Sequence, residues 1–156
     1  MGVEYFVVKW LHILSSTLIF GTGLGSAFFM FAASRGRNVA ALAFVARRVV
    51  TADWIFTTPA VVFQFPSGLY LAHLGGYDIT AGWLAGALGL YVFAGACWLP
   101  VVWMQIRMRD MAAVALKTGE ELPRRYQDYF RWWIILGSLA FPAVAAIFWL
   151  MVAKPG

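Results

Sequence analysis

Four long apolar stretches, separated by short polar connections, constrain this chain more than any other feature of its sequence. A helix needs about 20 mostly apolar residues to cross a bilayer, and lipid tolerates only structures whose backbone groups are paired internally. The 156 residues are 62% hydrophobic and 12% charged, whereas soluble domains carry roughly 25% charged residues. The sequence therefore predicts an all-α integral membrane four-helix bundle that forms a single domain over residues 1–156.

Turn and capping residues mark the ends of the expected helices. We expect helices over about 5–33, 39–74, 83–117 and 123–152. Asn38 is a good N-cap for the second helix, and Gly119 suits a C-terminal stop for the third. Pro123 suits the first turn of the fourth helix. Prolines inside three helices are expected to kink them: Pro59, Pro66, Pro100 and Pro142.

The basic residues predict the orientation in the membrane. They gather near the first and third connections: Arg35, Arg37, Arg47, Arg48, Arg107, Arg109, Lys117, Arg124, Arg125 and Arg131. The 74–82 turn holds no Lys or Arg, and each terminus holds one. The positive-inside rule then places both basic connections in the cytoplasm and both termini on the outer, periplasmic side of a bacterial inner membrane. The net charge of +5 therefore indicates topology and gives no reason to expect a nucleic-acid partner.

Two histidines, His12 and His73, are expected at similar depth in the outer half of the membrane. His12 lies roughly 10 Å along the first helix from Tyr5, at 1.5 Å per residue, and His73 ends the second helix. An imidazole inside lipid is costly and marks a candidate functional site. Two imidazoles on neighbouring helices could both ligate a b-type haem iron. His12 and His73 are therefore the predicted metal ligands.

One face of the first helix supports this interpretation. Lys9, His12, Ser16 and Gly23 share that face at helical spacing, and its small residues would let a neighbouring helix or a flat macrocycle approach closely. Lys9 could meet haem propionates at the interface, or it could simply extend to water. These residues complete the predicted cofactor-binding set.

Simpler roles stay open for both histidines. His12 could be satisfied by a hydrogen bond to Ser15, Ser16 or another helix, and His73 could be an interfacial residue without a ligand. Elsewhere, Gly21 and Gly25 form a GxxxG pair, which indicates close packing within the chain or between copies in a homo-oligomer.

A second polar group lies on the second helix. Asp53, Thr57 and Gln64 form a line if that helix is straight. This line could be a path for protons or a contact for a quinone headgroup. The alternative is hydrogen bonding between helices, together with an ion pair between Asp53 and an arginine.

Several short strings resemble a bacterial family of predicted integral membrane proteins that is defined only as a domain of unknown function. They are Lys9–Ile13, Phe20–Gly23, Val50–Asp53, Phe56–Ala60, Gln64–Gly68, Trp98–Pro100, Gln105–Ile106 and Leu122–Pro123. The opening Lys-x-Leu-His-Ile is also similar to HemJ-type protoporphyrinogen oxidases and, more distantly, to CopD-type copper-resistance domains. In the HemJ-type family the first-helix histidine is implicated in binding haem b, and His12 matches that position.

The leading hypothesis is a membrane b-type cytochrome that transfers electrons or carries out haem-based redox chemistry, with a quinone or a periplasmic redox protein as partner. One alternative is a cofactor-free membrane scaffold or assembly subunit. A HemJ-like porphyrinogen oxidase and a copper-handling protein are further alternatives. Thioethers accept copper(I), but Met104, Met108 and Met111 are expected on the opposite side of the membrane from both histidines.

Overall fold

The computed structural model describes residues 2–36 and 38–155, and its secondary structure in that part of the chain is entirely helical. The elements are α1 (Val3–Arg35), α2 (Val39–Ala52), the π-helical turn η1 (Asp53–Thr57), α3 (Thr58–Leu74), α4 (Gly82–Thr118) and α5 (Arg124–Ala153). The predicted all-α class is confirmed. Among the described residues, three helices are long and apolar enough to cross a membrane, namely α1, α4 and α5.

The second expected helix, 39–74, is interrupted. Its residues form α2, η1 and α3 in succession, with helical backbone angles at both junctions. Pro59 explains the position of the π-turn, because it has no N–H to donate and its ring would clash with the carbonyl of Ile55 in an unbroken α-helix. In a π-turn each backbone hydrogen bond spans five residues instead of four, and this wider turn relieves the conflict. By contrast, α3, α4 and α5 continue through Pro66, Pro100 and Pro142.

The capping residues follow the sequence closely. The Asn38 side chain accepts a hydrogen bond from the Ala41 N–H at 3.0 Å, and Gly119 ends α4 with a left-handed φ of 73°. One expectation was wrong: Pro123 has extended backbone and caps α5, so Arg124 is the first helical residue. An extended residue directly before a helix is the usual N-cap conformation.

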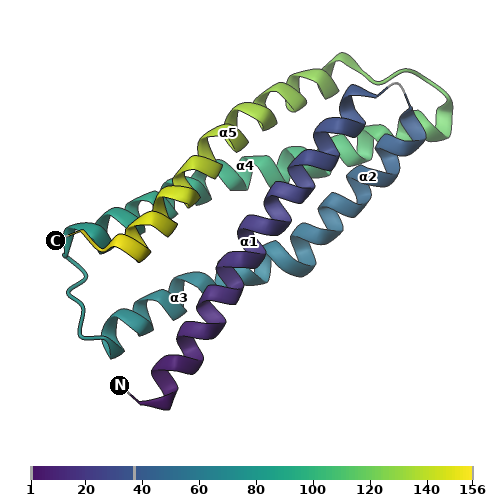
Figure 1. Cartoon of the computed structure of the whole chain (residues 1–156). Coiled ribbons are helices and arrows are strands. Elements are labelled where there is room, and N and C mark those ends of the chain that lie inside the picture. The colour runs from purple at the N-terminus through teal and green to yellow at the C-terminus, as the bar shows by residue number, and fades with distance from the viewer. Residues whose placement is uncertain (1, 37, 156) are drawn as a thin grey trace.

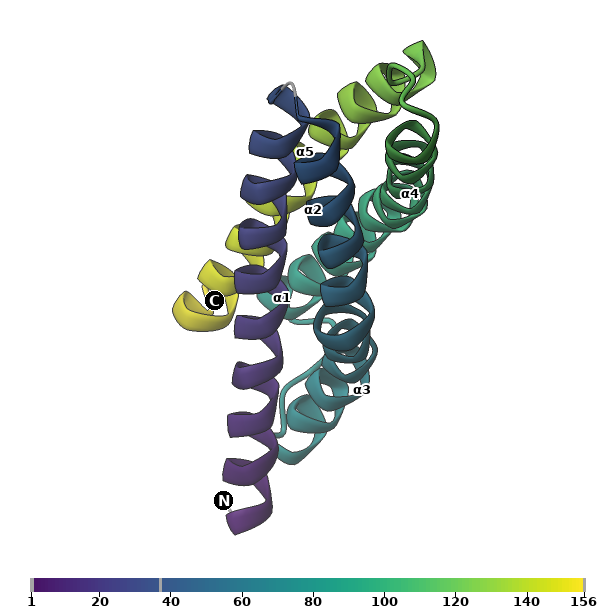
Figure 2. The same cartoon turned by 90° about the vertical axis from the view of Figure 1, so that its right-hand side faces the viewer.

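The helices pack as two pairs that α2 joins (Figure 1). α1 lies along α3 and α4 lies along α5, while α2 packs against both α1 and α4. Both basic connections lie at one end of the molecule, and the two termini lie at the other end with the 75–81 connection (Figures 1 and 2). A hydrogen bond of 2.7 Å joins distant segments at each end. Ser34 pairs with Tyr126 at the basic end, and Lys154 donates to Tyr77 at the other end.

The 75–81 connection is held by aromatic and charged contacts. The Lys154 ammonium lies 4.3 Å from the centroid of the Tyr77 ring, and Tyr77 packs edge-on against Trp83. The hydrogen bond from Lys154 and its positive charge lower the pKa of the Tyr77 phenol. Asp78 accepts hydrogen bonds from the backbone N–H and the hydroxyl of Thr80, and these lower the pKa of its carboxyl.

The tightest core lies toward the basic end. Met30, Leu42, Met108 and Tyr126 are almost completely buried there. Met104 and Met108 therefore belong to this core, as expected if the methionine stripe serves packing. In contrast, a Cβ atom placed on Gly21 or Gly25 would meet no described atom within 4 Å, so this pair does not bring helices of the chain together. A contact between copies stays a prediction.

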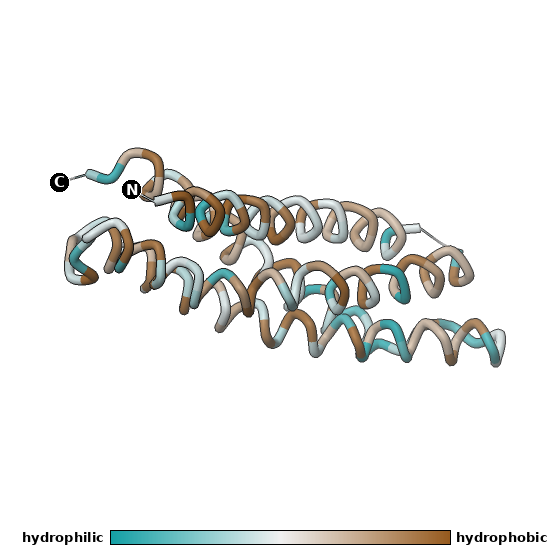
Figure 3. Tube along the Cα trace, turned by 90° about the horizontal axis from the view of Figure 1, so that it is seen from below, coloured by the Kyte–Doolittle hydropathy of each residue, from teal (hydrophilic) through white to brown (hydrophobic). Residues whose placement is uncertain are grey.

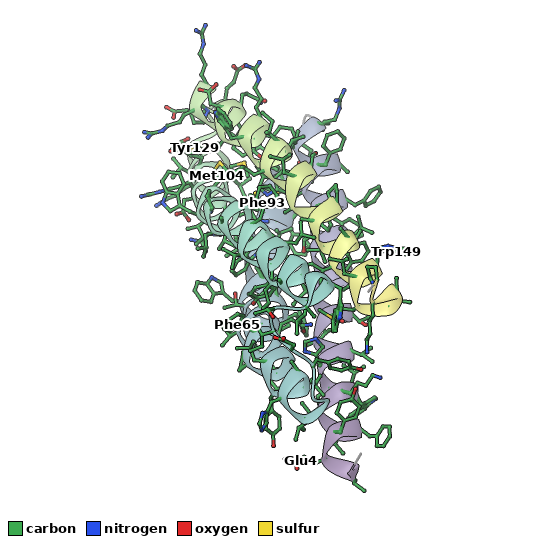
Figure 4. The ribbon with its side chains drawn as sticks, turned by 90° about the vertical axis from the view of Figure 1, so that its left-hand side faces the viewer. Glu4, Phe65, Phe93, Met104, Tyr129 and Trp149 are labelled. Carbon is green, nitrogen blue, oxygen red and sulfur yellow. The ribbon has the colours of Figure 1, made fainter. Side chains whose placement is uncertain are left out.

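Large apolar side chains cover the outside of the bundle. Trp149 is 69% exposed and projects from α5, and Phe65 and Phe93 are also exposed (Figure 4). Hydrophobic residues recur along every helix (Figure 3). A soluble monomer rarely exposes contiguous apolar patches of this extent, so these surfaces contact lipid.

Met108 and Met111 offer a matched test of this core. Met108 is fully buried, whereas Met111 is only partly buried at the edge of the cluster. We expect Met108→Ala to lower the free energy of unfolding by roughly 2–5 kcal/mol, because truncation leaves a cavity, and Met111→Ala to cost clearly less. Thermal unfolding in mild detergent measures both, and equal losses would contradict the assigned core.

Candidate functional site

His12 on α1 lies in a polar cluster with Ser15, Gln64 and Ser67, two of which contact its ring. Its Nδ1 is 2.7 Å from Ser67 Oγ, and its Nε2 is 2.9 Å from Gln64 Nε2. The Ser15 hydroxyl donates to Gln64 Oε1, and the same Oγ lies 3.0 Å from the backbone carbonyl oxygen of His12. Ser15 and Ser67 are buried and His12 is partly buried. The cluster therefore joins α1 to α3 through side chains.

The hydrogen bonds of this cluster define the tautomer of His12. Ser67 Oγ donates to the carbonyl oxygen of Phe63 at 2.7 Å, so it accepts the proton on His12 Nδ1. The Gln64 NH₂ group has no lone pair to offer, so it donates to His12 Nε2. With the Gln64 amide in this orientation, the imidazole carries its proton on Nδ1, and its Nε2 lone pair accepts from Gln64. A metal would bind that lone pair, and a hydrogen bond from the other nitrogen orients such a ligand.

Gly68 permits the close approach of the two helices at this point. A Cβ atom at position 68 would lie 3.2 Å from His12 Cε1, tighter than most real contacts of a Cβ. Gly68 has ordinary helical backbone within α3. Gly68 was not among the predicted site residues, and only its packing partner reveals why a small residue is needed here.

His73 lies apart from this cluster. It is exposed at the C-terminal end of α3. At about 100° per residue, His73 lies roughly half a turn around the helix from Gln64 and roughly a third of a turn from Ser67. The side of α3 that contacts His12 is therefore not the side that carries His73, and the structure does not bring the two imidazoles together.

The other predicted residues divide between two places. Lys9 is exposed, and its ammonium lies 5.6 Å from the centroid of the Tyr5 ring. Ser16 and Gly23 line a cleft of about 700 Å³. A Cβ atom on Gly23 would lie 3.3 Å from the Phe141 ring of α5, so Gly23 sits where α1 approaches α5.

The cleft lies between α1, α4 and α5, where the contact between α1 and α5 is slight, and one side is formed by η1 and α3. Its lining is mostly apolar and aromatic. Polar side chains enter it from α3 and α4, among them Gln64 and Tyr91, whose hydroxyl donates to the Val61 carbonyl at 2.7 Å. Gln64 therefore contacts His12 on one side and the cleft on the other.

Asp53 lines the same cleft at the start of the π-turn and is 4% exposed. Thr57 donates to Asp53 Oδ1 at 2.9 Å. With the Gln105 amide oriented to suit its neighbours, its NH₂ group donates to Asp53 Oδ2 at 2.8 Å, and its oxygen accepts from Trp133 Nε1 at 3.3 Å. The hydrogen bonding expected of Asp53 is present, but the expected arginine partner is not. In the described residues the one ion pair joins Arg109 and Asp110.

No three His, Cys, Asp or Glu side chains lie close enough to hold a metal ion together in residues 2–36 and 38–155. A haem iron takes only one or two protein ligands, so this finding bears on bare metal ions alone. Sequence reasoning also gave no indication that Gln105 and Trp133 would meet Asp53, since they come from two other helices.

Residues 6–155 match a family described as "Predicted integral membrane protein (DUF2269)". The match covers nearly the whole chain, so the chain belongs to this family and is a multi-pass membrane protein. No curated protein and no solved structure matches it.

Gly68 provides a direct test of the contact between α1 and α3. We expect Gly68→Val to lower the free energy of unfolding by about 1–3 kcal/mol, because the added methyls overpack against the His12 ring. Gly21→Val is the matched control, since a Cβ there meets no described atom within 4 Å. Thermal unfolding in detergent measures both, and a Gly68→Val protein as stable as the control would show that the helices do not meet at His12.

Proposed function

We propose that this membrane protein binds a b-type haem and that His12 is the histidine ligand of the iron. The observation that supports the proposal is the arrangement around the His12 ring, in which Ser67 accepts from Nδ1–H and the Nε2 lone pair accepts only the Gln64 amide. This is the protonation state that metal ligation requires, with the hydrogen-bond acceptor that commonly orients a ligating histidine.

The residues around His12 fit one axial ligand rather than two. The Gln64 amide now donates to Nε2, so Gln64 would have to release the ring for a metal to bind. Gln64 also lines the 700 Å³ cleft, so its side chain has space on that side to move away from the ring. The role of second ligand for His73 stays a prediction, and its position around α3 gives that role little support.

The topology belongs to the same proposal. The α2–η1–α3 segment keeps helical backbone angles through its π-turn, so we infer a four-helix membrane bundle in which this segment crosses the membrane together with α1, α4 and α5. The basic connections share one end of the molecule (Figure 1). By the positive-inside rule that end is cytoplasmic, and both termini are periplasmic in a bacterial inner membrane.

A bound haem would supply one-electron transfer at the outer half of the membrane. The chain itself contributes the oriented imidazole and the buried Ser67 that holds it. Electrons would pass between a quinol in the membrane and a periplasmic redox protein.

A second candidate is a scaffold or assembly subunit without a cofactor. Both nitrogens of His12 already have partners on α3, so the cluster can also serve as a polar connection between two helices. Inter-helix hydrogen bonds in membranes contribute about 0.6–2 kcal/mol. In this case His12 would contribute to stability and to nothing else.

The visible spectrum of protein purified after haem-supplemented expression separates the two candidates. We expect a Soret band that shifts on reduction with dithionite, its loss in His12→Ala and its persistence in His73→Ala. Ser67→Ala should lower haem affinity by about 10–100-fold, because the orienting acceptor of Nδ1–H is removed.

Two results would contradict the haem proposal. A colourless wild-type protein whose His12→Ala variant is merely less stable would establish the scaffold role. A spectrum that is unchanged in His12→Ala would show that another residue ligates the iron.

A further inference from the structure

We propose that the cleft between α1, α4 and α5 binds a lipophilic cation from the membrane, with the Asp53 carboxylate as its counter-charge. This inference is independent of haem binding at His12. It starts from a buried acid that the haem proposal does not use and that faces a large apolar space.

Within the residues that the structure describes, Asp53 is an acid without a basic partner. It is 4% exposed, and its neighbours Thr57 and Gln105 are both neutral. No Lys or Arg is among the residues that line the cleft in the described part of the chain. A charged side chain at membrane depth is expensive unless it is paired, and residues of this kind commonly mark functional sites.

The carboxylate also has acceptor capacity left. Its two oxygens offer about four lone-pair positions, and the structure gives each oxygen one donor, Thr57 on Oδ1 and Gln105 on Oδ2. Because Asp53 lines the cleft, a positive group in the cleft could approach it and offset the cost of burying its charge.

The rest of the lining suits the apolar body of such a ligand. Aromatic rings come from all the long helices around the cleft: Phe20, Tyr91, Trp98, Trp133, Phe141 and Phe148. Aromatic faces attract cations, most strongly when the cation is desolvated. A volume of about 700 Å³ lies in the range of small-molecule sites, which are mostly apolar with a few polar groups.

The position of the cleft favours a ligand that arrives from the bilayer. α1 and α5 border it and touch each other only slightly, and the outer faces of both helices carry exposed apolar side chains. A neutral headgroup such as a quinone would find hydrogen-bond partners here, but it would leave the Asp53 charge uncompensated. Charge complementarity therefore favours a cation.

Tetraphenylphosphonium is a suitable probe, since it combines a delocalised positive charge with four aromatic rings. Equilibrium dialysis against the detergent-purified full chain measures its binding. Triphenylphosphine oxide, which is neutral and of similar shape, is the matched ligand control. We expect saturable binding of the cation at least about tenfold tighter than that of the neutral compound, since only the cation gains the ion pair with Asp53.

Substitutions of Asp53 test the counter-charge. Asp53→Asn should weaken cation binding by about tenfold or more and leave the neutral compound unaffected, whereas Asp53→Glu should retain most of the affinity. Asp128→Asn, the same change at an exposed position of α5 that does not line the cleft, is the control.

A second pair of variants tests the location without touching the acid. Gly137 lines the cleft, and a Cβ atom there meets no described atom within 4 Å, so Gly137→Leu should fill the cleft and block the cation. Gly89→Leu is the control, because Gly89 has similar free space but does not line the cleft.

Three results would overturn the proposal. They are equal binding of the cation and the neutral compound by the wild-type chain, full cation affinity in folded Asp53→Asn, and full cation affinity in Gly137→Leu. A short-chain ubiquinone that binds saturably to wild type and Asp53→Asn alike, where the cation does not bind, would assign the cleft to a neutral headgroup instead. None of these results depends on a haem spectrum, so failure here is distinct from failure of the haem proposal.

Discussion

Polar groups inside a bilayer must find partners within the protein, and this requirement governs the arrangement of the helices. Helices in lipid gain no hydrophobic free energy by associating, because lipid tails are as apolar as their side chains. Hydrogen bonds and close packing therefore determine which helices contact each other. His12 on α1 meets Gln64 and Ser67 on α3, and Gly68 makes room for the ring. The pairing of α1 with α3 is therefore specified by side chains that are a minority in an apolar sequence.

The π-turn distributes the polar residues of the α2–η1–α3 segment between two neighbouring helices. In a straight α-helix, Asp53 and Gln64 would lie on nearly the same face, since eleven residues make just over three full turns. In the structure Asp53 contacts Gln105 of α4, whereas Gln64 contacts His12 of α1. The extra residue in η1 rotates α3 about the helix axis relative to α2. Pro59 thus affects the site, although it lines no part of the cleft.

Features that depend on local chemistry could be predicted from the sequence. Contacts that depend on how a helix is rotated about its own axis could not. Helical class, the Asn38 cap and the Gly119 stop follow from residues at known spacing, and the structure agrees with them. The interruption before Pro59 was expected only as a kink. The predicted pairing of His12 with His73 assumed that depth in the membrane determines contact. In the structure His12 meets Gln64 and Ser67, which precede His73 by nine and six residues on α3, and His73 also lies on another side of that helix.

The two candidate sites are separate but share a boundary. Asp53 and Gln64 are eleven residues apart, which is about 16 Å along a helix, so a ligand at one would not occupy the other by contact alone. Both side chains nevertheless line the same cleft. Gln64 contacts His12 Nε2 and also faces that space, so one amide group forms the boundary between the two candidate sites.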